Sequence, residues 1–194
     1  MNLYNLPHYD FLLSQMQTIF ENSDISTFTG ELIDVINPDP SKIRIEDIAH
    51  ALSQLCRFGG HSKTFYSVAQ HSIAVSYLVP EKYALEGLLH DSTEAFMVDL
   101  PRPIKNKIAL YKKIENNLYT NGISKKFNLL PELPEEVHQA DNAMIVYEWF
   151  NYMDLKPEFQ SMLQDFKEKF FKIKSTQEIE NEFITRYEQL LFCR

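Results

Sequence analysis

The chain has 194 residues, of which 44% are hydrophobic, 13% aromatic and 24% charged, with only five glycines. This composition excludes a disordered, collagen-like or low-complexity protein and predicts one globular domain over residues 1–194. The 19 Lys and Arg residues and 27 Asp and Glu residues give a net charge of −8. We therefore expect no binding to duplex nucleic acid, which needs a broad basic face.

Membrane and secretion signals are not expected in this chain. Its longest uncharged run, residues 64–80, contains Gln70, His71 and several serines, which argues against a membrane span. The N-terminus lacks the basic stretch and apolar stretch of a secretory signal. The two cysteines, Cys56 and Cys193, are far apart and form no CxxC pair, which favours reduced thiols. We expect a cytoplasmic protein, in the host cytoplasm if a phage encodes it.

Apolar residues recur at three- and four-residue intervals along most of the chain, which predicts an all-α fold. A first amphipathic helix is expected over residues 9–20 and another over residues 45–56. Between them, residues 29–38 combine a turn, a short alternating stretch and a proline-rich end. The sequence thus predicts a helical bundle with a short irregular or β-hairpin-like N-terminal insertion.

Capping residues predict where the next two helices begin. Ser67 and Gln70 have the spacing of a capping box, which predicts a helix that reaches about residue 78. Pro80 then opens a helix over residues 81–90. We therefore expect the two histidines at positions 71 and 90 on consecutive helices.

Prolines and a second capping box mark the second half of the chain. Residues 98–103 contain two prolines and predict a loop, followed by a helix that begins near Lys105. Pro134 predicts the start of a helix that reaches about residue 152. Ser175, three residues before a glutamate, predicts a last helix that ends near residue 191.

No Gly- or Ser-rich linker divides the chain into domains. We expect a core over about residues 45–153, with C-terminal helices at residues 157–192 packed on it. Within this core, residues 144–150 are apolar enough to form the central helix.

Four residues of metal-binding type occur in a distinctive order: His71, the adjacent pair His90 and Asp91, and Asp141. Two imidazoles and two carboxylates suit one Mn, Co, Zn, Fe or Mg ion and leave positions open for water and a phosphate. Taken alone, each histidine is more often a hydrogen-bonded core residue than a ligand. Asp141 alone could simply favour the first turn of its helix. The prediction of a divalent-metal site therefore rests on the joint pattern.

The surrounding residues resemble the HD superfamily of metal-dependent phosphohydrolases, whose signature is a His, a His-Asp pair and a distant Asp, all on helices. The stretches His90–Glu94 and Asp99–Lys105 are similar to the HDxxE and DLPxPxK run of bacterial 5′-deoxynucleotidases in that superfamily. The resemblance covers about the middle half of the chain, from Arg57 to Asp141. It implies a single HD-domain helical bundle that forms a homo-oligomer, a dimer or larger.

The resemblance also implies roles at the metal site. His71, His90, Asp91 and Asp141 would bind the metal, and Asp91 would act in catalysis together with Glu94. Glu94 would orient or deprotonate the attacking water, or protonate the leaving oxygen. Because Glu94 follows Asp91 by three residues, a continuous helix would place both side chains on one face.

Four further residues are candidates for substrate binding. Arg57 resembles the phosphate-holding arginine of the family, a role that suits a planar donor able to hold two phosphate oxygens. Asp99 matches the position that contacts the sugar 3′-hydroxyl and favours deoxyribose, although it could equally be a turn residue. Lys105 could add positive charge near the phosphates. His61 could donate to a phosphate or simply cap the helix before it.

Residues 59–67 depart from the pattern of the nucleotidases. Similar Gly-His forms belong to a sub-branch, found partly in phages, that includes HD deoxynucleoside triphosphohydrolases. Monophosphate and triphosphate substrates therefore both remain open. Phe58, Phe65 and Tyr66 are candidates to stack on a base, although aromatic residues more often pack in a core.

The sequence predicts a divalent-metal-dependent phosphohydrolase of (deoxy)nucleotides that attacks the α-phosphate with a metal-activated water. The expected activity is that of a 5′-deoxynucleotidase or a deoxynucleoside triphosphohydrolase, and the expected partner is a small nucleotide. One alternative is an HD module that senses a nucleotide without turning it over. Another is an HD phosphodiesterase of cyclic or guanosine tetraphosphate-like nucleotides. P-loop, Rossmann, serine-hydrolase and zincin motifs are absent from the sequence.

Overall fold

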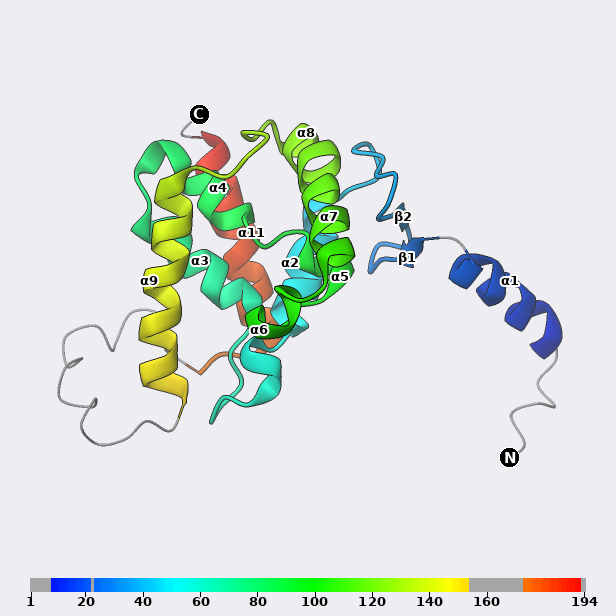
Figure 1. The fold of residues 1–194 in the computed structure, drawn as a ribbon, viewed down its shortest axis with the longest axis horizontal. Coiled ribbons are helices and arrows are strands. Elements are labelled where there is room, and N and C mark those ends of the chain that lie inside the picture. The colour runs from blue at the N-terminus through cyan, green and yellow to red at the C-terminus, as the bar shows by residue number, and fades with distance from the viewer. Residues whose placement is uncertain (1–7, 22, 154–172, 193–194) are drawn as a thin grey trace.

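The structure, a computed structural model, describes residues 8–21, 23–153 and 173–192. In these residues the chain is mostly helical, with one two-stranded antiparallel sheet near the N-terminus (Figure 1). The predictions of a helical protein and of a small N-terminal hairpin are both confirmed. No helix in the described ranges is long and apolar enough to cross a membrane.

The N-terminal region consists of one helix and the hairpin. Helix α1 (Tyr9–Glu21) lies apart from the helical bundle, beyond strands β1 (Asp24–Ser26) and β2 (Leu32–Asp34) (Figure 1). Strand β1 precedes the stretch predicted as a hairpin, which holds only the turn and β2. The carboxylate of Asp47 anchors this turn to the bundle, because it accepts bonds from the amide of Thr29 at 2.7 Å and its hydroxyl at 2.9 Å.

The bundle contains helices of very different lengths. In chain order they are α2 (Ile45–Gln54), α3 (Val68–Leu78), α4 (Ala84–Leu89), α5 (Glu94–Met97), α6 (Arg102–Lys105), α7 (Ala109–Asn117), α8 (Ser124–Phe127), α9 (Glu135–Tyr152) and α11 (Thr176–Phe192). Short helical turns lie at η2 (Arg57–Gly60), η3 (Glu81–Tyr83) and η4 (Leu118–Ile123). The capping boxes predicted at Ser67 and Ser175 are both confirmed.

Helix α3 occupies the centre of the bundle, and α2, α4, α9 and α11 all pack against it. Residues 68–76 are buried on every side. The helix tolerates this because it contains no Asp, Glu, Lys or Arg and several small residues. The prediction that residues 144–150 form the central helix was wrong. They belong to α9, which buries Met144 but leaves Val146 and Trp149 about half exposed, because only one face of α9 meets the core.

A glycine allows α4 to approach α3 closely. A Cβ atom at Gly87 would lie 3.0 Å from Cγ2 of Val79 and 3.2 Å from Cα of Ser76. Any side chain at this position would therefore push the two helices apart. The close approach matters for the site, because α3 carries His71 and α4 leads directly into His90.

The second half of the chain differs in detail from the prediction. Instead of one helix near Lys105, the structure has a short helix from Arg102 and a separate helix α7. Helix α11 packs against α2, α3 and α4, as expected for the end of the chain. The part of the C-terminal prediction at residues 157–172 lies outside the described residues.

Candidate metal centre

The structure brings the four predicted metal ligands together from three parts of the chain. His71 comes from α3, His90 and Asp91 from the turn after α4, and Asp141 from α9. Nε2 of His71 lies 3.3 Å from Nε2 of His90, 3.2 Å from Oδ1 of Asp141 and 3.7 Å from Oδ2 of Asp91. Nε2 of His90 lies 3.1 Å from the same Oδ2 of Asp91. These four residues are called the metal cluster below.

The spacing of these atoms fits the donor set of a divalent cation. Metal–ligand bonds of about 2.1 Å at right angles place neighbouring ligand atoms about 3 Å apart. The distances of 3.1–3.3 Å in the metal cluster match that spacing. Both histidines are buried, and the two carboxylates are only partly exposed. The cluster can therefore offer buried nitrogen ligands and partly exposed oxygen ligands to one cation.

Both imidazoles are oriented by a hydrogen bond on their far side. Nδ1 of His71 lies 2.5 Å from Oε1 of Glu148, and Nδ1 of His90 lies 2.9 Å from the carbonyl oxygen of Gly87. These acceptors assign the proton to Nδ1 in each neutral ring, which leaves the Nε2 lone pair facing the cluster. A metal ion that displaces any proton on Nε2 therefore meets each ring in the orientation and tautomer that a ligand needs.

Charge in the metal cluster favours a cation. Burial and the charge of Arg57 disfavour protonation of His71, but the carboxylates of Glu148 and Asp141 outweigh them and raise its pKa to about 9. Burial would raise the pKa of Asp141, yet its hydrogen bond to His71 and the nearby imidazoles lower it to about 2. The pKa of Asp91 is also lowered, against burial, by the imidazoles and the guanidinium. The carboxylates therefore stay ionised, and a proton or a metal ion can balance them.

Arg57 lies beside the metal cluster, in the turn η2. Its Nη2 donates to Glu148 at 3.0 Å, and its Nη1 lies 3.7 Å from Asp91 and 4.0 Å from Asp99. Its Nε is buried and has no hydrogen-bond partner within the described chain. Burial would lower the pKa of this guanidinium, but the surrounding carboxylates raise it, so the side chain stays charged. Arg57 thus presents a fixed positive charge with an unused N–H.

Glu94 and Asp91 do not share one continuous helix, so the condition for placing their side chains on one helical face is not met. Helix α4 ends at Leu89, and α5 begins at Glu94 after a turn in which the Glu94 amide donates to the Asp91 carbonyl at 2.9 Å. The Glu94 side chain is buried, with Oε1 3.6 Å from Nζ of Lys105 and Oε2 without a partner in the described residues. Burial, followed by the charges of Asp91 and Asp99, raises its pKa well above the usual range. Glu94 therefore keeps its proton to a higher pH than an exposed glutamate does.

Asp99 and Lys105 lie at the edge of the same region. Burial raises the pKa of Asp99, although the nearby Arg57 opposes the shift. Nζ of Lys105 lies 2.5 Å from Glu115 as well as near Glu94. The predicted substrate residues Arg57, Asp99 and Lys105 therefore converge on the metal cluster.

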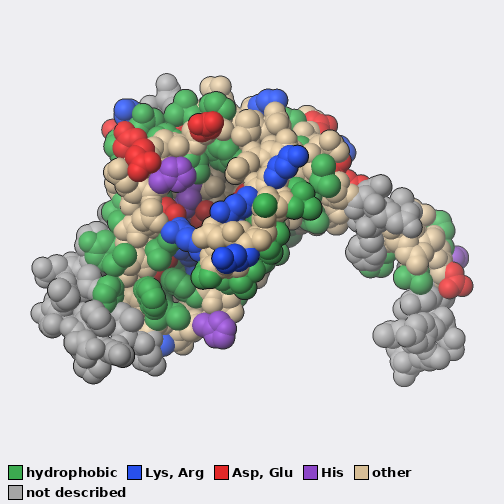
Figure 2. Space-filling view, viewed as in Figure 1, with side chains coloured by type: hydrophobic (Ala, Val, Ile, Leu, Met, Phe, Trp, Pro, Cys, Tyr) green, Lys and Arg blue, Asp and Glu red, His purple; other side chains and the backbone are tan. Residues whose placement is uncertain are grey.

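The face above α6 and α9 is hollowed, and Lys and Arg side chains gather there around acidic ones (Figure 2). Arg102 spans the two helices. Its Nη2 donates to Oδ2 of Asp141 at 3.0 Å and its Nη1 to Oδ1 of Asn142 at 2.8 Å. About half of the Arg102 side chain is exposed, so this arginine forms part of the rim of the site.

The chain is 44% identical over 128 residues to the uncharacterized protein YfdR of Escherichia coli, and the match covers 65% of this chain and 70% of YfdR. The chain belongs to the YfdR family. It is also 34% identical over 125 residues to an uncharacterized protein of Rhodobacter capsulatus, with 59% of this chain and 63% of that protein covered. No family model matches the chain. The names of these two relatives state no activity.

Glu148 contacts the candidate site of this YfdR-family chain, and sequence reasoning missed it. Its carboxylate is fully buried and accepts from the Tyr66 hydroxyl at 2.9 Å, in addition to its contacts with His71 and Arg57. It lies seven residues, or two helical turns, after Asp141, and is the one charged residue in the apolar run 144–150. The sequence did contain a signal for this role: a single acidic residue in an apolar run, on the same helix face as the predicted ligand Asp141.

The structure shows the surroundings of two other candidates, His61 and Tyr66. His61 is exposed, and its amide donates to the Phe58 carbonyl at 3.2 Å, which is the capping arrangement considered as its alternative. Tyr66 is fully buried against Tyr152, so it cannot stack on a base. Phe65 is 40% exposed and remains a candidate for such a contact.

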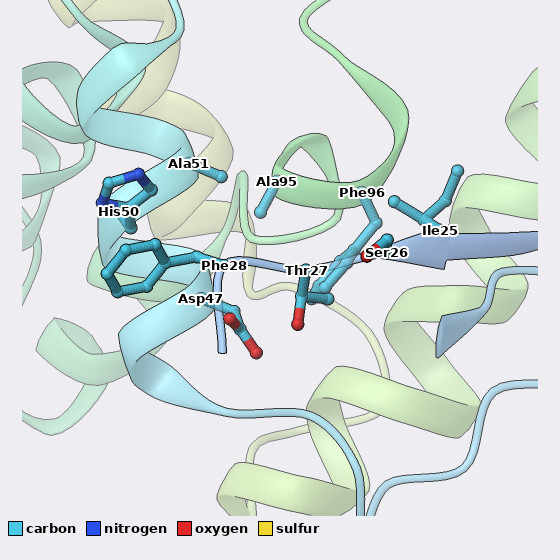
Figure 3. A pocket seen from close by; sticks show the side chains of 9 residues that line it. All are labelled: Ile25, Ser26, Thr27, Phe28, Asp47, His50, Ala51, Ala95 and Phe96. Atoms are coloured by element: carbon cyan, nitrogen blue, oxygen red, sulfur yellow. The ribbon is translucent and has the colours of Figure 1, made fainter. Parts of the chain in front are cut away.

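A separate pocket of about 280 Å³ lies between the hairpin turn, α2 and α5 (Figure 3). Phe28 stacks on His50 at its edge, with ring centroids 3.8 Å apart. His50 also lies 3.0 Å from Glu180, and both carboxylate oxygens of Asp47 bind Thr29. These polar side chains are already engaged within the protein, so the ligand chemistry is concentrated at the metal cluster.

Proposed function

We propose that the protein is a divalent-metal-dependent phosphohydrolase of the HD superfamily that acts on deoxynucleotides. The observation that carries the proposal is the convergence of His71, His90, Asp91 and Asp141, with both Nε2 atoms turned toward the carboxylates. A divalent cation bound there would polarise a phosphoryl oxygen and lower the pKa of a water molecule.

Arg57 is suited to hold the phosphate. Its guanidinium is always charged and planar, so it can donate to two phosphate oxygens at once. Glu148 and Asp91 hold the group in place, while Nε keeps an unused N–H. In a protein with a net charge of −8, this local positive charge is needed to attract an anionic substrate.

Glu94 is suited to move the proton that hydrolysis requires. Its raised pKa favours the protonated form, which can pass a proton to the leaving 5′ oxygen. It then regains a proton from the water whose oxygen joins phosphorus. Proton loss and gain therefore balance at one carboxyl group.

Asp99 and the cations at the rim suit the rest of a nucleotide. A carboxylate at Asp99 can accept a hydrogen bond from a sugar 3′-hydroxyl, next to the arginine that holds the phosphate. Lys105 and Arg102 add positive charge near the same region. The products distinguish two substrates: a monophosphate yields phosphate, and a triphosphate cleaved at the α-phosphorus yields triphosphate.

Product analysis tests the proposal. Chelator-treated protein is incubated with dAMP, AMP or dATP, with and without Mn²⁺, Co²⁺, Zn²⁺ or Mg²⁺, and phosphate is resolved from triphosphate. We expect metal-dependent release of deoxynucleoside, abolished in the His90→Ala/Asp91→Ala variant and retained in the control His50→Gln. Activity that survives the double substitution would overturn the proposal. Tight nucleotide binding without any product would instead favour a sensing module.

A further inference from the structure

Val98 has a strained backbone beside the site. Its φ is 72° and its ψ is 146°, a region that is essentially restricted to glycine, and valine is β-branched. The residue is 55% exposed, so packing in the core does not explain the conformation. The residue lies at the end of α5, which begins with Glu94, and directly precedes Asp99. Any relaxation of Val98 would rotate the peptide that orients Asp99.

Tyr111 from α7 holds this strained segment. Its hydroxyl lies 2.9 Å from the carbonyl oxygen of Met97 and 2.7 Å from that of Val98, so its one hydrogen is shared between the two acceptors. Burial, and then the nearby carboxylates of Glu115, Glu94 and Asp99, raise the pKa of the phenol. The hydroxyl therefore remains a donor throughout the physiological pH range.

The same face of α7 also reaches Glu94. Glu115 follows Tyr111 by four residues, so the two side chains lie on one face of the helix. Glu115 lies 2.5 Å from Nζ of Lys105, which lies 3.6 Å from Oε1 of Glu94. One helix face thus contacts both the backbone ahead of Asp99 and the cation beside Glu94.

We propose that Tyr111 is a positioning residue that keeps Val98 in its strained conformation and thereby directs Asp99 toward the sugar of a deoxynucleotide. The inference rests on the proposed function and adds to it the element that sets sugar selectivity. A displacement of about 1 Å in a substrate-contacting group can lower a rate about 100-fold. A contact that keeps one peptide in place can therefore have a measurable effect on the rate.

The variant Tyr111→Phe removes the hydroxyl and keeps the ring. We expect kcat/KM for dAMP to fall about tenfold, mainly through a higher KM, and the preference for dAMP over AMP to fall by a similar factor. Adding Val98→Gly should restore kcat/KM to within about threefold of the wild type, because glycine adopts a positive φ without restraint. Tyr187→Phe, which removes a hydroxyl from α11, is the control and should leave these values unchanged.

A second readout does not depend on activity. Backbone ¹³C and ¹⁵N chemical shifts of residues 97–99, measured on the full chain without added metal, report the sign of φ at Val98. We expect a change to negative φ in Tyr111→Phe and none in Tyr187→Phe. If the wild type turns over no nucleotide, the proposed function fails while this readout still tests Tyr111. A positive φ that persists in Tyr111→Phe, or a failure of Val98→Gly to rescue activity, would overturn the inference.

Discussion

Substitution of Glu148 by glutamine tests whether this buried carboxylate organises the metal cluster. Glu148 accepts hydrogen bonds from His71, Arg57 and Tyr66, and none of these groups is exposed. Glutamine has nearly the same shape but only one acceptor oxygen, and its NH₂ group must face one of the three donors. At least one buried donor therefore loses its partner, and the negative charge is lost entirely.

The expected losses follow from these contacts. A buried hydrogen bond to a charged group contributes about 1.5–3 kcal/mol, and breaking a buried ion pair costs about 3–5 kcal/mol. Arg57 keeps Asp91 at 3.7 Å, so we expect the free energy of unfolding to fall by about 2–4 kcal/mol. Because Glu148 also orients His71, the Mn²⁺ affinity should fall about 10- to 100-fold.

Urea unfolding and calorimetric titration with Mn²⁺ measure the two effects separately. The control is Glu188→Gln, which removes an exposed carboxylate from α11 and should change the free energy of unfolding by no more than about 0.5 kcal/mol. If Glu148→Gln behaves like this control in both measurements, Glu148 does not organise the site and the reasoning is refuted.

Two further predictions concern the packing of α3 against α4 and the N-terminal hairpin. Gly87→Ala places a Cβ atom 3.2 Å from the Ser76 backbone. The free energy of unfolding, measured by thermal unfolding, should therefore fall by about 1–3 kcal/mol, and Mn²⁺ binding should become weaker. Unchanged stability would contradict the close approach of α3 and α4. The second prediction concerns Asp34 in strand β2. Hydrogen bonds, first from the Ser23 hydroxyl and then from Asn37 and Ile36, lower its pKa from 3.8 to about 2. The ionised group thus stabilises the hairpin above pH 4, and this stability is lost as the pH falls through 2. Asp34→Asn should lower the free energy of unfolding by about 1 kcal/mol at pH 5. In urea unfolding, this difference from the wild type should shrink as the pH falls from 4 toward 2. A difference independent of pH would contradict the assignment.

Local signals in the sequence were sufficient to predict most helix boundaries. The helices that begin after Ser67, Pro134 and Ser175 start where their capping residues predicted. These signals are reliable because a cap interacts with backbone groups only two or three residues away. The end of α4 at Leu89 agrees with the helix end predicted at residue 90. The four-residue helix α5 was not predicted, because neither proline nor glycine marks its start.

Residue type and order were also sufficient to nominate His71, His90, Asp91 and Asp141, and their resemblance to the HD pattern nominated Arg57 and Glu94. Local sequence could not show which aromatic and charged side chains face the site. Tyr66 was a candidate for base stacking, yet the fold buries it. Burial of a side chain depends on packing between elements. Periodicity shows which face of one helix is apolar, but not which other elements cover that face.

By itself, the sequence determined a mostly helical chain, the ends of its capped helices and the set of residues with metal-binding chemistry. Only the tertiary structure decided that Glu148 orients His71, 77 residues earlier in the chain, and that Tyr111 holds the strained peptide before Asp99. Such contacts join elements that are remote in sequence, and their geometry depends on how closely whole helices pack. At Gly87 that packing depends on the absence of a single Cβ atom. The sequence of α4 does not show that this glycine lies against α3, the helix that carries His71.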